Sequence, residues 1–267
     1  MTTAPAASTA PASPARPVAL VRRPSARLAE GELTHRQREP IDIDLARTQW
    51  RAYVTALEAA GFTAREVGAA DALADSVFVE DTVVVFGDIA VITSPGAVSR
   101  RPETEASASA VRSLGLDVRE ISLPGTLDGG DVLKVARTVY VGRGGRTNLE
   151  GIRQLATFVE PAGYVVVTVP VTKVLHLKSA VTALPDGCVI GYEPLVDDAS
   201  VFPSFLAVPE ETGAAVVVLP DGGVLMASSA PESARLFEQR GLHVVTVDVS
   251  EFEKLEGCVT CLSVRVR

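Results

Sequence analysis

The chain has 267 residues, of which 47% are hydrophobic and 5% aromatic, and its formal net charge is −8. This length supports one large α/β domain with a substantial core, or two small domains. The acidic balance argues against nucleic acid as a partner, because phosphates need a basic face, and it mildly favours a small cationic ligand.

An Ala/Pro/Ser/Thr-rich tract, residues 1–17, opens the sequence and is predicted to be a disordered tail. It has neither the charged start nor the continuous apolar centre of a secretion signal. No later stretch is apolar over the ~18 residues that a membrane span needs. We therefore expect no membrane partner, and we expect residues 18–267 to form a single domain.

The first elements expected in this domain are a strand at residues 18–22 and an amphipathic helix at residues 42–60. A glycine followed by an alternating strand then recurs at residues 61–67, 115–121, 163–169 and 241–247. Glycine suits the left-handed residue that ends a helix, and β-branched alternation suits a half-buried strand. A weaker copy without the glycine lies at residues 202–210.

Two further helices are predicted at residues 148–159 and 231–240, with Asn148 and Ser229 as N-terminal caps. Hairpins are predicted at residues 77–93, 132–142, 179–191 and 214–226. A C-terminal strand at residues 258–266 needs a partner, and the N-terminal strand is available. The chain thus reads as about five modules of helix, strand and hairpin, closed by pairing of its two ends. Two independently packed domains are the alternative.

Polar residues that could carry chemistry gather where the hairpin strands begin. They are Asp75, Glu80 and Asp81 in the first module, Asp128 and Asp131 around a glycine pair in the second, His176 in the third, and Cys258 and Cys261 in the closing strand. Equivalent positions of a radial repeat converge near its axis, so these groups are expected to share one pocket. Taken singly, each also fits a plainer role: an ion-paired acid, a turn, or a packed histidine.

Three cysteines, Cys188, Cys258 and Cys261, with no export signal, favour free thiols in a reducing cytoplasm. Cys258 and Cys261 could form a redox or metal motif, but zinc would need a second pair of ligands. In an extended strand, residues three apart face opposite sides and lie about 10 Å apart. That separation exceeds disulfide reach, so we expect one sulfur to face the axis and the other the core.

Six segments together carry a family resemblance: FVED (78–81), PGAVSRR (95–101), TLDGGDVL (126–133), GRTN (145–148), LHLKS (175–179) and GCVTCLSV (257–264). In this order they resemble the dimethylarginine dimethylaminohydrolases, a family of guanidino-group-modifying enzymes. The resemblance implies an α/β fold, namely a five-bladed β/α-propeller of ββαβ modules closed by pairing of the N- and C-terminal strands.

The same resemblance assigns roles to individual residues. Cys261 corresponds to the nucleophile, His176 to the general acid–base and Asp128 to the carboxylate that holds the histidine and the guanidinium. Asp75, Glu80 and Asp81 correspond to acids at the cationic end of the substrate, and Arg100 and Arg146 to a clamp on its α-carboxylate. Leu33 falls in a flexible lid, residues 28–35, while Leu255 and Glu256 correspond to positions at the substrate's α-amine.

The implied activity is hydrolysis of Nω-methylated arginine to citrulline through a covalent cysteine intermediate. It needs a small cationic substrate, no metal and no organic cofactor, and it is compatible with a homodimer. Arginine deiminases carry an acid two positions after the catalytic histidine, where this chain has Lys178; a solvated strand end is the plainer explanation for that lysine. The alternatives are another guanidine-modifying enzyme (a deiminase or amidinotransferase), a binding protein on the same fold, or a metal- or redox-responsive protein using Cys258 and Cys261.

Overall fold

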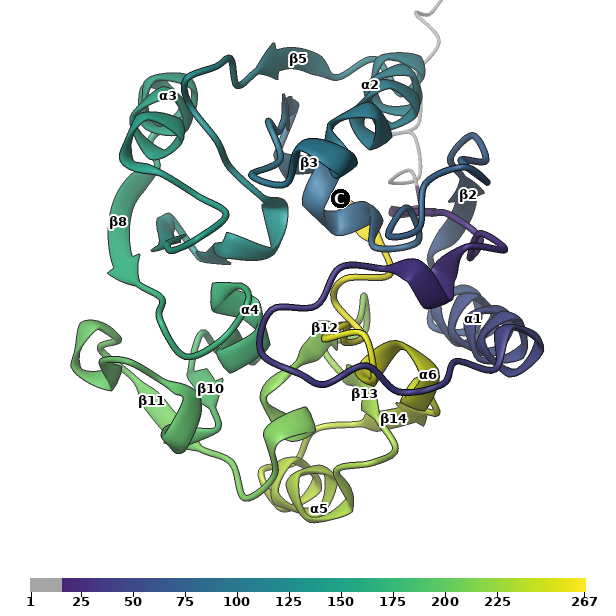
Figure 1. Cartoon of the computed structure of the whole chain (residues 1–267). Helices are drawn as coiled ribbons and strands as arrows, with labels where there is room; N and C mark the ends of the chain where they lie inside the picture. The colour runs from purple at the N-terminus through teal and green to yellow at the C-terminus, as the bar shows by residue number, and fades with distance from the viewer. Residues whose placement is uncertain (1–15) are drawn as a thin grey trace, which may run out of the picture.

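The computed structural model describes residues 16–267, so most of the predicted tail lies outside the described residues. Five three-stranded sheets are arranged in a ring (Figure 1). In each sheet an antiparallel pair is joined by a third, parallel strand. This confirms a mixed α/β architecture built from a repeated module.

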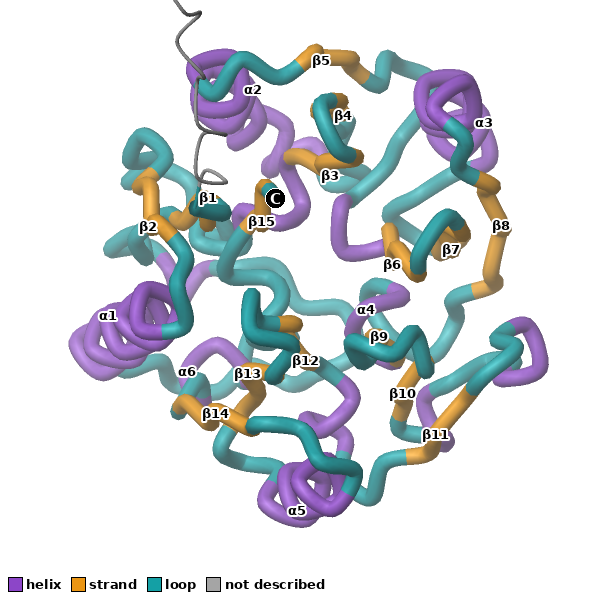
Figure 2. Tube along the Cα trace, turned by 180° about the vertical axis from the view of Figure 1, so that it is seen from behind, coloured by secondary structure: helices purple, strands orange, loops and turns teal. Residues whose placement is uncertain are grey.

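The strands occupy equivalent positions in the five sheets (Figure 2). The innermost strands are β3 (Val83–Phe86), β6 (Val132–Val135), β9 (Val181–Ala183), β12 (Val216–Val218) and β15 (Val264–Val266). The middle strands are β4 (Ile89–Ile92), β7 (Thr138–Arg143), β10 (Val189–Gly191), β13 (Val224–Ala227) and β1 (Val18–Val21). The outer strands are β5 (Asp117–Glu120), β8 (Val165–Pro170), β11 (Phe205–Ala207), β14 (Val244–Val247) and β2 (Thr63–Glu66).

Four modules carry a rim helix between the middle and outer strands: α1 (Ile43–Ala59), α2 (Thr104–Ser113), α3 (Leu149–Val159) and α5 (Pro231–Gln239). The module of β9–β11 has two 3₁₀ turns instead, η6 (Glu193–Leu195) and η7 (Ala199–Val201). This absence of a rim helix explains why the repeat lacks its glycine there. The four repeat glycines have φ between 78° and 101°, as the left-handed helix ends require.

Of the two predicted helix caps, Asn148 is confirmed and Ser229 is wrong, while α1 has a further cap in Asp42. Asp42 accepts hydrogen bonds from the first turn of α1, and Asn148 accepts one from the amide of Gly151 in α3. Helix α5 begins after Ala230 with Pro231 at its first position, and proline there fixes the helical φ without a cap. The Ser229 hydroxyl instead lies 2.7 Å from Glu253.

Strand β1 pairs antiparallel with β15, with Val18 opposite Val266, and parallel with β2. One sheet therefore combines both ends of the described chain. Between neighbouring sheets the rim helices supply the core: Ile152, Leu155 and Val159 of α3 pack in one cluster with strands of the β3–β5 and β6–β8 sheets. Within residues 16–267, no helix combines the length and apolar character needed to cross a lipid bilayer.

A short helical turn precedes four of the innermost strands, and reverse turns precede the fifth. The turns are η2 (Val79–Thr82), η4 (Gly129–Asp131), α4 (Leu177–Ala180) and η8 (Glu211–Ala214), followed by residues 259–262 before β15. The sequence predicted strand at three of these places, including residues 258–263, and that prediction is wrong. Their apolar residues pack inward from a turn as readily as from a strand, so periodicity could not separate the two.

The remaining short elements are α6 (Ser250–Glu253), η1 (Leu28–Glu30), η3 (Val98–Glu103) and η5 (Glu160–Ala162).

Candidate active site

A small pocket lies where the turns that precede the innermost strands converge; η2, the start of α4 and the turn before β15 each contribute to its lining. Its volume is about 20 Å³, room for about one water molecule. Eight of the residues singled out in the sequence line it: Asp75, Asp81, Arg100, Arg146, His176, Leu255, Glu256 and Cys261. Glu32, Phe78, Leu175 and Gly257 complete the lining.

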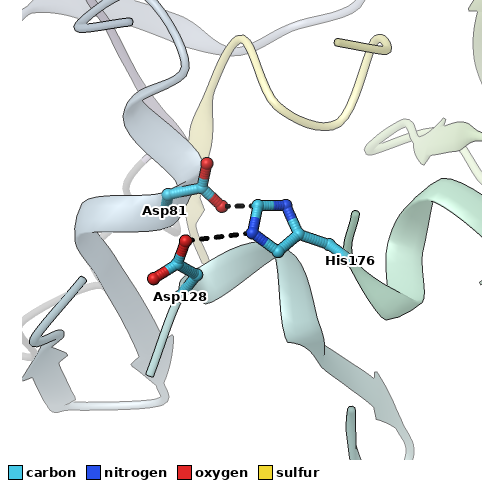
Figure 3. Close-up of side chains that lie close together, drawn as sticks. All are labelled: Asp81, Asp128 and His176. Carbon is cyan, nitrogen blue, oxygen red and sulfur yellow. Dashed lines mark hydrogen bonds and ion pairs between the residues drawn. The ribbon is translucent and has the colours of Figure 1, made fainter. Parts of the chain in front are cut away.

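The His176 ring is buried at the start of α4 and faces two carboxylates, those of Asp81 and Asp128 (Figure 3). Its Nε2 lies 3.0 Å from Asp128 Oδ2, and its Nδ1 lies 3.8 Å from Asp81 Oδ1. Burial works to lower the pKa of His176, but Asp81, the hydrogen bond with Asp128 and the nearby Asp131 outweigh it and raise the pKa to about 9. His176 is therefore a protonated imidazolium at neutral pH, ready to give up a proton.

The stability of the fold should depend on this proton. The His176 pKa is about 9 in the folded protein and near 6.5 unfolded, so its contribution is complete below pH 6.5 and is lost as pH rises to about 9. Relative to a His176→Asn variant, wild-type unfolding free energy should fall by about 3 kcal/mol over this range. Urea unfolding at each pH measures it, with His243→Asn, an exposed histidine paired with Asp221, as control. Parallel curves for wild-type and His176→Asn would contradict the bound proton.

Asp128 and the two glycines after it shape the wall beside His176. Asp128 is completely buried, and its Oδ1 accepts the amide of Gly96 at 2.8 Å. A Cβ on Gly130 would lie 2.7 Å from both His176 Nδ1 and Asp81 Oδ1, so glycine permits this close approach. Asp128 does not itself line the pocket. Its carboxylate contacts His176 Nε2 from outside the pocket. The Asp-Gly-Gly-Asp run therefore positions His176 and is not merely a surface turn.

The two C-terminal thiols lie together, which corrects the predicted separation. Cys258 Sγ is 3.4 Å from Cys261 Sγ, because a reverse turn, in which the Cys261 amide donates to the Cys258 carbonyl, replaces the extended strand. The hydrogen bond from Cys261 lowers the pKa of Cys258 to about 7. The same contact, with burial, raises the pKa of Cys261. In this resting arrangement the first proton leaves Cys258, and Cys261 keeps its own.

Arg100 is buried and forms a network with acids on both sides. It donates to Asp81 Oδ2 at 2.6 Å and to both carboxylate oxygens of Glu103. Burial opposes ionisation of Asp81, but the charges of His176 and Arg100 outweigh it and lower the Asp81 pKa to about 2. Asp81 is therefore a fixed negative charge in the pocket wall, and it links Arg100 to His176.

A loop of residues 31–38 covers the pocket and is fixed by two of the predicted site residues. The Asp75 carboxylate accepts the amide of Glu32 at 3.1 and 3.2 Å. The Glu256 carboxylate accepts three consecutive amides, those of residues 34–36, at 2.5 to 2.9 Å. Leu33 lies in this loop and packs against the core instead of lining the pocket.

Glu80 does not share the pocket predicted for it. Its Oε1 lies 2.7 Å from Lys178 Nζ and 2.9 Å from Arg265 Nη2, and all three residues line a second cavity among the innermost strands. The carboxylate turns toward these cations because they compensate its buried charge. Lys178 is accordingly buried and ion-paired, so its interpretation as a solvated strand end is wrong.

Two acids of the site were missed or left without a role by the sequence analysis. Glu32 enters the pocket from the covering loop, where Arg146 donates to it at 3.0 Å; its sequence context gives no signal, since loop glutamates are usually solvated. Asp131 accepts the first amide of α4 at 2.9 Å and the Thr147 hydroxyl at 2.6 Å. Burial raises the Asp131 pKa to about 6. Its place in the Asp-Gly-Gly-Asp run was the available signal.

Asp81, Asp128 and His176 each offer a possible metal-ligand atom within 4.8 Å of the others. An imidazolium has no free lone pair for a metal, however, and both carboxylates already accept hydrogen bonds from backbone amides. The three residues therefore fit a proton-transfer cluster better than a metal site. They lie near two thiols and near buried guanidinium and carboxylate charges. This combination of groups is typical of an enzyme that uses a cysteine thiol to act on a small charged molecule.

No protein-family model matches the chain, but individual proteins do. It is 62% identical over 249 residues to the dimethylarginine dimethylaminohydrolase of Streptomyces coelicolor, covering 93% of this chain and 96% of that one. It is 34% identical to the Pseudomonas aeruginosa enzyme of the same name, covering 92% and 98%. A cysteine-to-serine variant of the Pseudomonas enzyme, solved with citrulline, superposes with a TM-score of 0.87 at 32% identity, covering 94% and 99%.

The chain belongs to the dimethylarginine dimethylaminohydrolase family, as the six segments indicated.

Proposed function

We propose that this protein hydrolyses asymmetric dimethylarginine and monomethylarginine to citrulline, releasing dimethylamine or methylamine. The observation that carries the proposal is an imidazolium, His176, facing Asp128 and Asp81 in the wall of the pocket that Cys261 also lines. Family membership gives the substrate class. The pocket chemistry gives the reaction type, because a guanidinium needs a strong nucleophile and a protonated leaving amine.

In the proposed reaction the Cys261 thiolate attacks the guanidinium carbon. His176 then protonates the departing amine, which leaves a thiouronium intermediate on Cys261. Water, deprotonated by the now neutral His176, attacks the same carbon; the carbon–sulfur bond breaks, the proton of the new hydroxyl passes to the solvent, and citrulline and the thiolate are released. Cys261 keeps its proton in the resting site, and His176 is already protonated, so the thiol proton passes to the solvent when the cationic substrate binds and favours the thiolate.

The charged groups around Cys261 are suited to positioning the substrate. Asp81 provides a permanent negative charge toward the guanidinium. Arg146, with the Nη1 hydrogen of Arg100 that Asp81 does not use, is proposed to bind the α-carboxylate. Leu255 and Glu256 are proposed to meet the α-amine and Asp75 to face the cationic end with Asp81, once the covering loop that carries Leu33 has moved. Movement is required, because about 20 Å³ cannot hold an amino acid.

Glu32 occupies the partner position that the substrate's carboxylate would take on Arg146. A Glu32→Gln variant should therefore lower KM by a few-fold, the strength of a partly exposed ion pair, with little change in kcat. Steady-state citrulline assays measure the effect, with Glu39→Gln, an exposed glutamate of the same segment, as control. A raised KM in Glu32→Gln would show that Glu32 assists substrate binding instead of competing with it.

Citrulline release from asymmetric dimethylarginine, monomethylarginine and arginine tests the function directly. Turnover of the methylated substrates with little from arginine is expected. Lys178, locked to Glu80 at 2.7 Å, leaves no carboxylate at the place where deiminases bind the unsubstituted nitrogen. Turnover of arginine alone would favour a deiminase, and no turnover of any of the three by folded, reduced protein would refute the proposal.

The proposal extends to the architecture and setting of the enzyme. The five sheets with their rim helices support a five-bladed β/α-propeller formed as a single domain by residues 18–267, closed by the sheet that both chain ends share. Three free cysteines support a reducing cytoplasm as its compartment.

A further inference from the structure

We propose that Cys258 and Cys261 are the site of a reversible disulfide, formed by a hydroperoxide-class oxidant, that switches the enzyme off by consuming its nucleophile. The inference rests on the proposed function only for the role of Cys261. The pairing itself follows from the closeness of the two thiols. The proposed hydrolysis does not require a second thiol beside Cys261.

The turn at residues 258–261 brings the two thiols within reach of each other. The hydrogen bond between the Cys261 amide and the Cys258 carbonyl is 3.1 Å long, and such a turn holds the first and fourth Cα atoms within ~7 Å. A disulfide needs Cα atoms about 4.4–6.8 Å apart. The sulfurs, both free and 3.4 Å apart, need only side-chain rotation to reach the bonding distance of about 2 Å.

The two sulfurs belong to different cavities, and this gives an oxidant its path. Cys261 lines the small pocket, which has room for about one water, whereas Cys258 lines a neighbouring cavity of about 400 Å³ bordered by Lys173, Glu211 and Glu253. Cys258 is partly exposed, and Cys261 is buried. A small oxidant or a reducing thiol therefore reaches Cys258 first, without opening the loop over the nucleophile.

Cys258 is also the sulfur that ionises first, since hydrogen bonding from Cys261 lowers its pKa to about 7. Its thiolate attacks one peroxide oxygen; the oxygen–oxygen bond breaks, giving a sulfenic acid on Cys258 and one water after protonation. The Cys261 sulfur, losing its proton, then attacks the Cys258 sulfur, and the sulfur–oxygen bond breaks to release a second water. Two thiols and one hydrogen peroxide thus give one disulfide and two waters, and an added dithiol reverses the change.

The disulfide also protects the nucleophile. A lone cysteine that reaches sulfenic acid can proceed to sulfinic acid, which thiols do not reduce. With the two sulfurs 3.4 Å apart, a sulfenic acid on either cysteine is captured by the other thiol before a second peroxide arrives. Cys188 provides an internal comparison: it is buried before β10, and its Sγ donates a hydrogen bond to the carbonyl of Val189.

The test treats wild-type, Cys258→Ser, Cys258→Ala and Cys188→Ser proteins with hydrogen peroxide, blocks free thiols, and measures peptide masses and citrulline formation before and after dithiothreitol. In wild-type and Cys188→Ser we expect the peptide with both cysteines to lose two hydrogens, and activity to fall and then return with reductant. In both Cys258 variants we expect Cys261 to gain two oxygens, and the lost activity not to return.

Oxygen gain on Cys261 of the wild-type protein without a disulfide, or equal recovery of the Cys258 variants, would overturn the proposal. The masses are read without substrate. A disulfide in a protein that makes no citrulline would therefore uphold the redox site while refuting the proposed function.

Discussion

Replacement of Cys261 by alanine is expected to abolish citrulline formation, with a fall in kcat on the order of 10⁴-fold or more. The other pocket groups position charge and move protons, but none can form the carbon–sulfur bond on which the reaction depends. Cys261 is 7% exposed, and its replacement by alanine removes only one sulfur atom from the side chain, so the fold should persist. Cys188→Ala, which removes a buried thiol that does not line the pocket, is the matched control and should keep wild-type turnover.

A binding measurement separates loss of chemistry from loss of the site. Cys261→Ala should still bind asymmetric dimethylarginine, because the proposed ligands for both ends of the substrate remain, and calorimetry can detect this. Near-wild-type turnover by the variant would refute the covalent scheme. Lost binding together with lost turnover would show that Cys261 supports the shape of the pocket as well as its reactivity.

Replacement of Asp128 by asparagine is expected to lower kcat by a factor on the order of 10² to 10⁴. Asparagine can still accept the Gly96 amide, so the shape of the wall is retained. What it removes is the negative charge 3.0 Å from His176 Nε2. His176 would then hold its proton less tightly, and its ring could adopt the wrong tautomer for transfer to the leaving amine.

The pH profile identifies the cause of that loss. The alkaline limb of kcat/KM in wild-type should lie near pH 9, where His176 loses its proton, and it should move to lower pH in Asp128→Asn, because the removed charge was one that raised the pKa. Asp221→Asn, which removes an exposed aspartate paired with His243, should leave both kcat and the limb unchanged. An unmoved limb in Asp128→Asn would mean that the titrating group is not His176.

The sequence predicted the module well because its signals are local. The glycine that ends each rim helix, the cap Asn148, and the alternating strand that follows are decided by neighbouring residues, and the structure has them where expected. The pairing of β1 with β15 followed from one further consideration, that a repeat with two open edges gains by joining them.

The site was predicted less completely, because its details depend on long-range contacts. Residues 258–261 have a strand-like apolar pattern, yet they turn, so a predicted 10 Å between two sulfurs becomes 3.4 Å. Glu80 turns away from the pocket toward Lys178 and Arg265, cations that only folding brings near it. Glu32 reaches Arg146 across 114 residues, and no local pattern encodes such a contact.

The sheet that joins β1 to β15 has a consequence for the order of events during synthesis. Residues 18–21 form its central strand and residues 264–266 one of its edges, and the turn that carries Cys261 immediately precedes that edge strand. While the ribosome is still adding the later modules, β1 has no antiparallel partner and the nucleophile has not been made. Such sequence-distant contacts form slowly, since a long loop must close before they stabilise anything. Activity should therefore appear only after the last strand has docked. The onset of citrulline production during synthesis would then report when folding is complete.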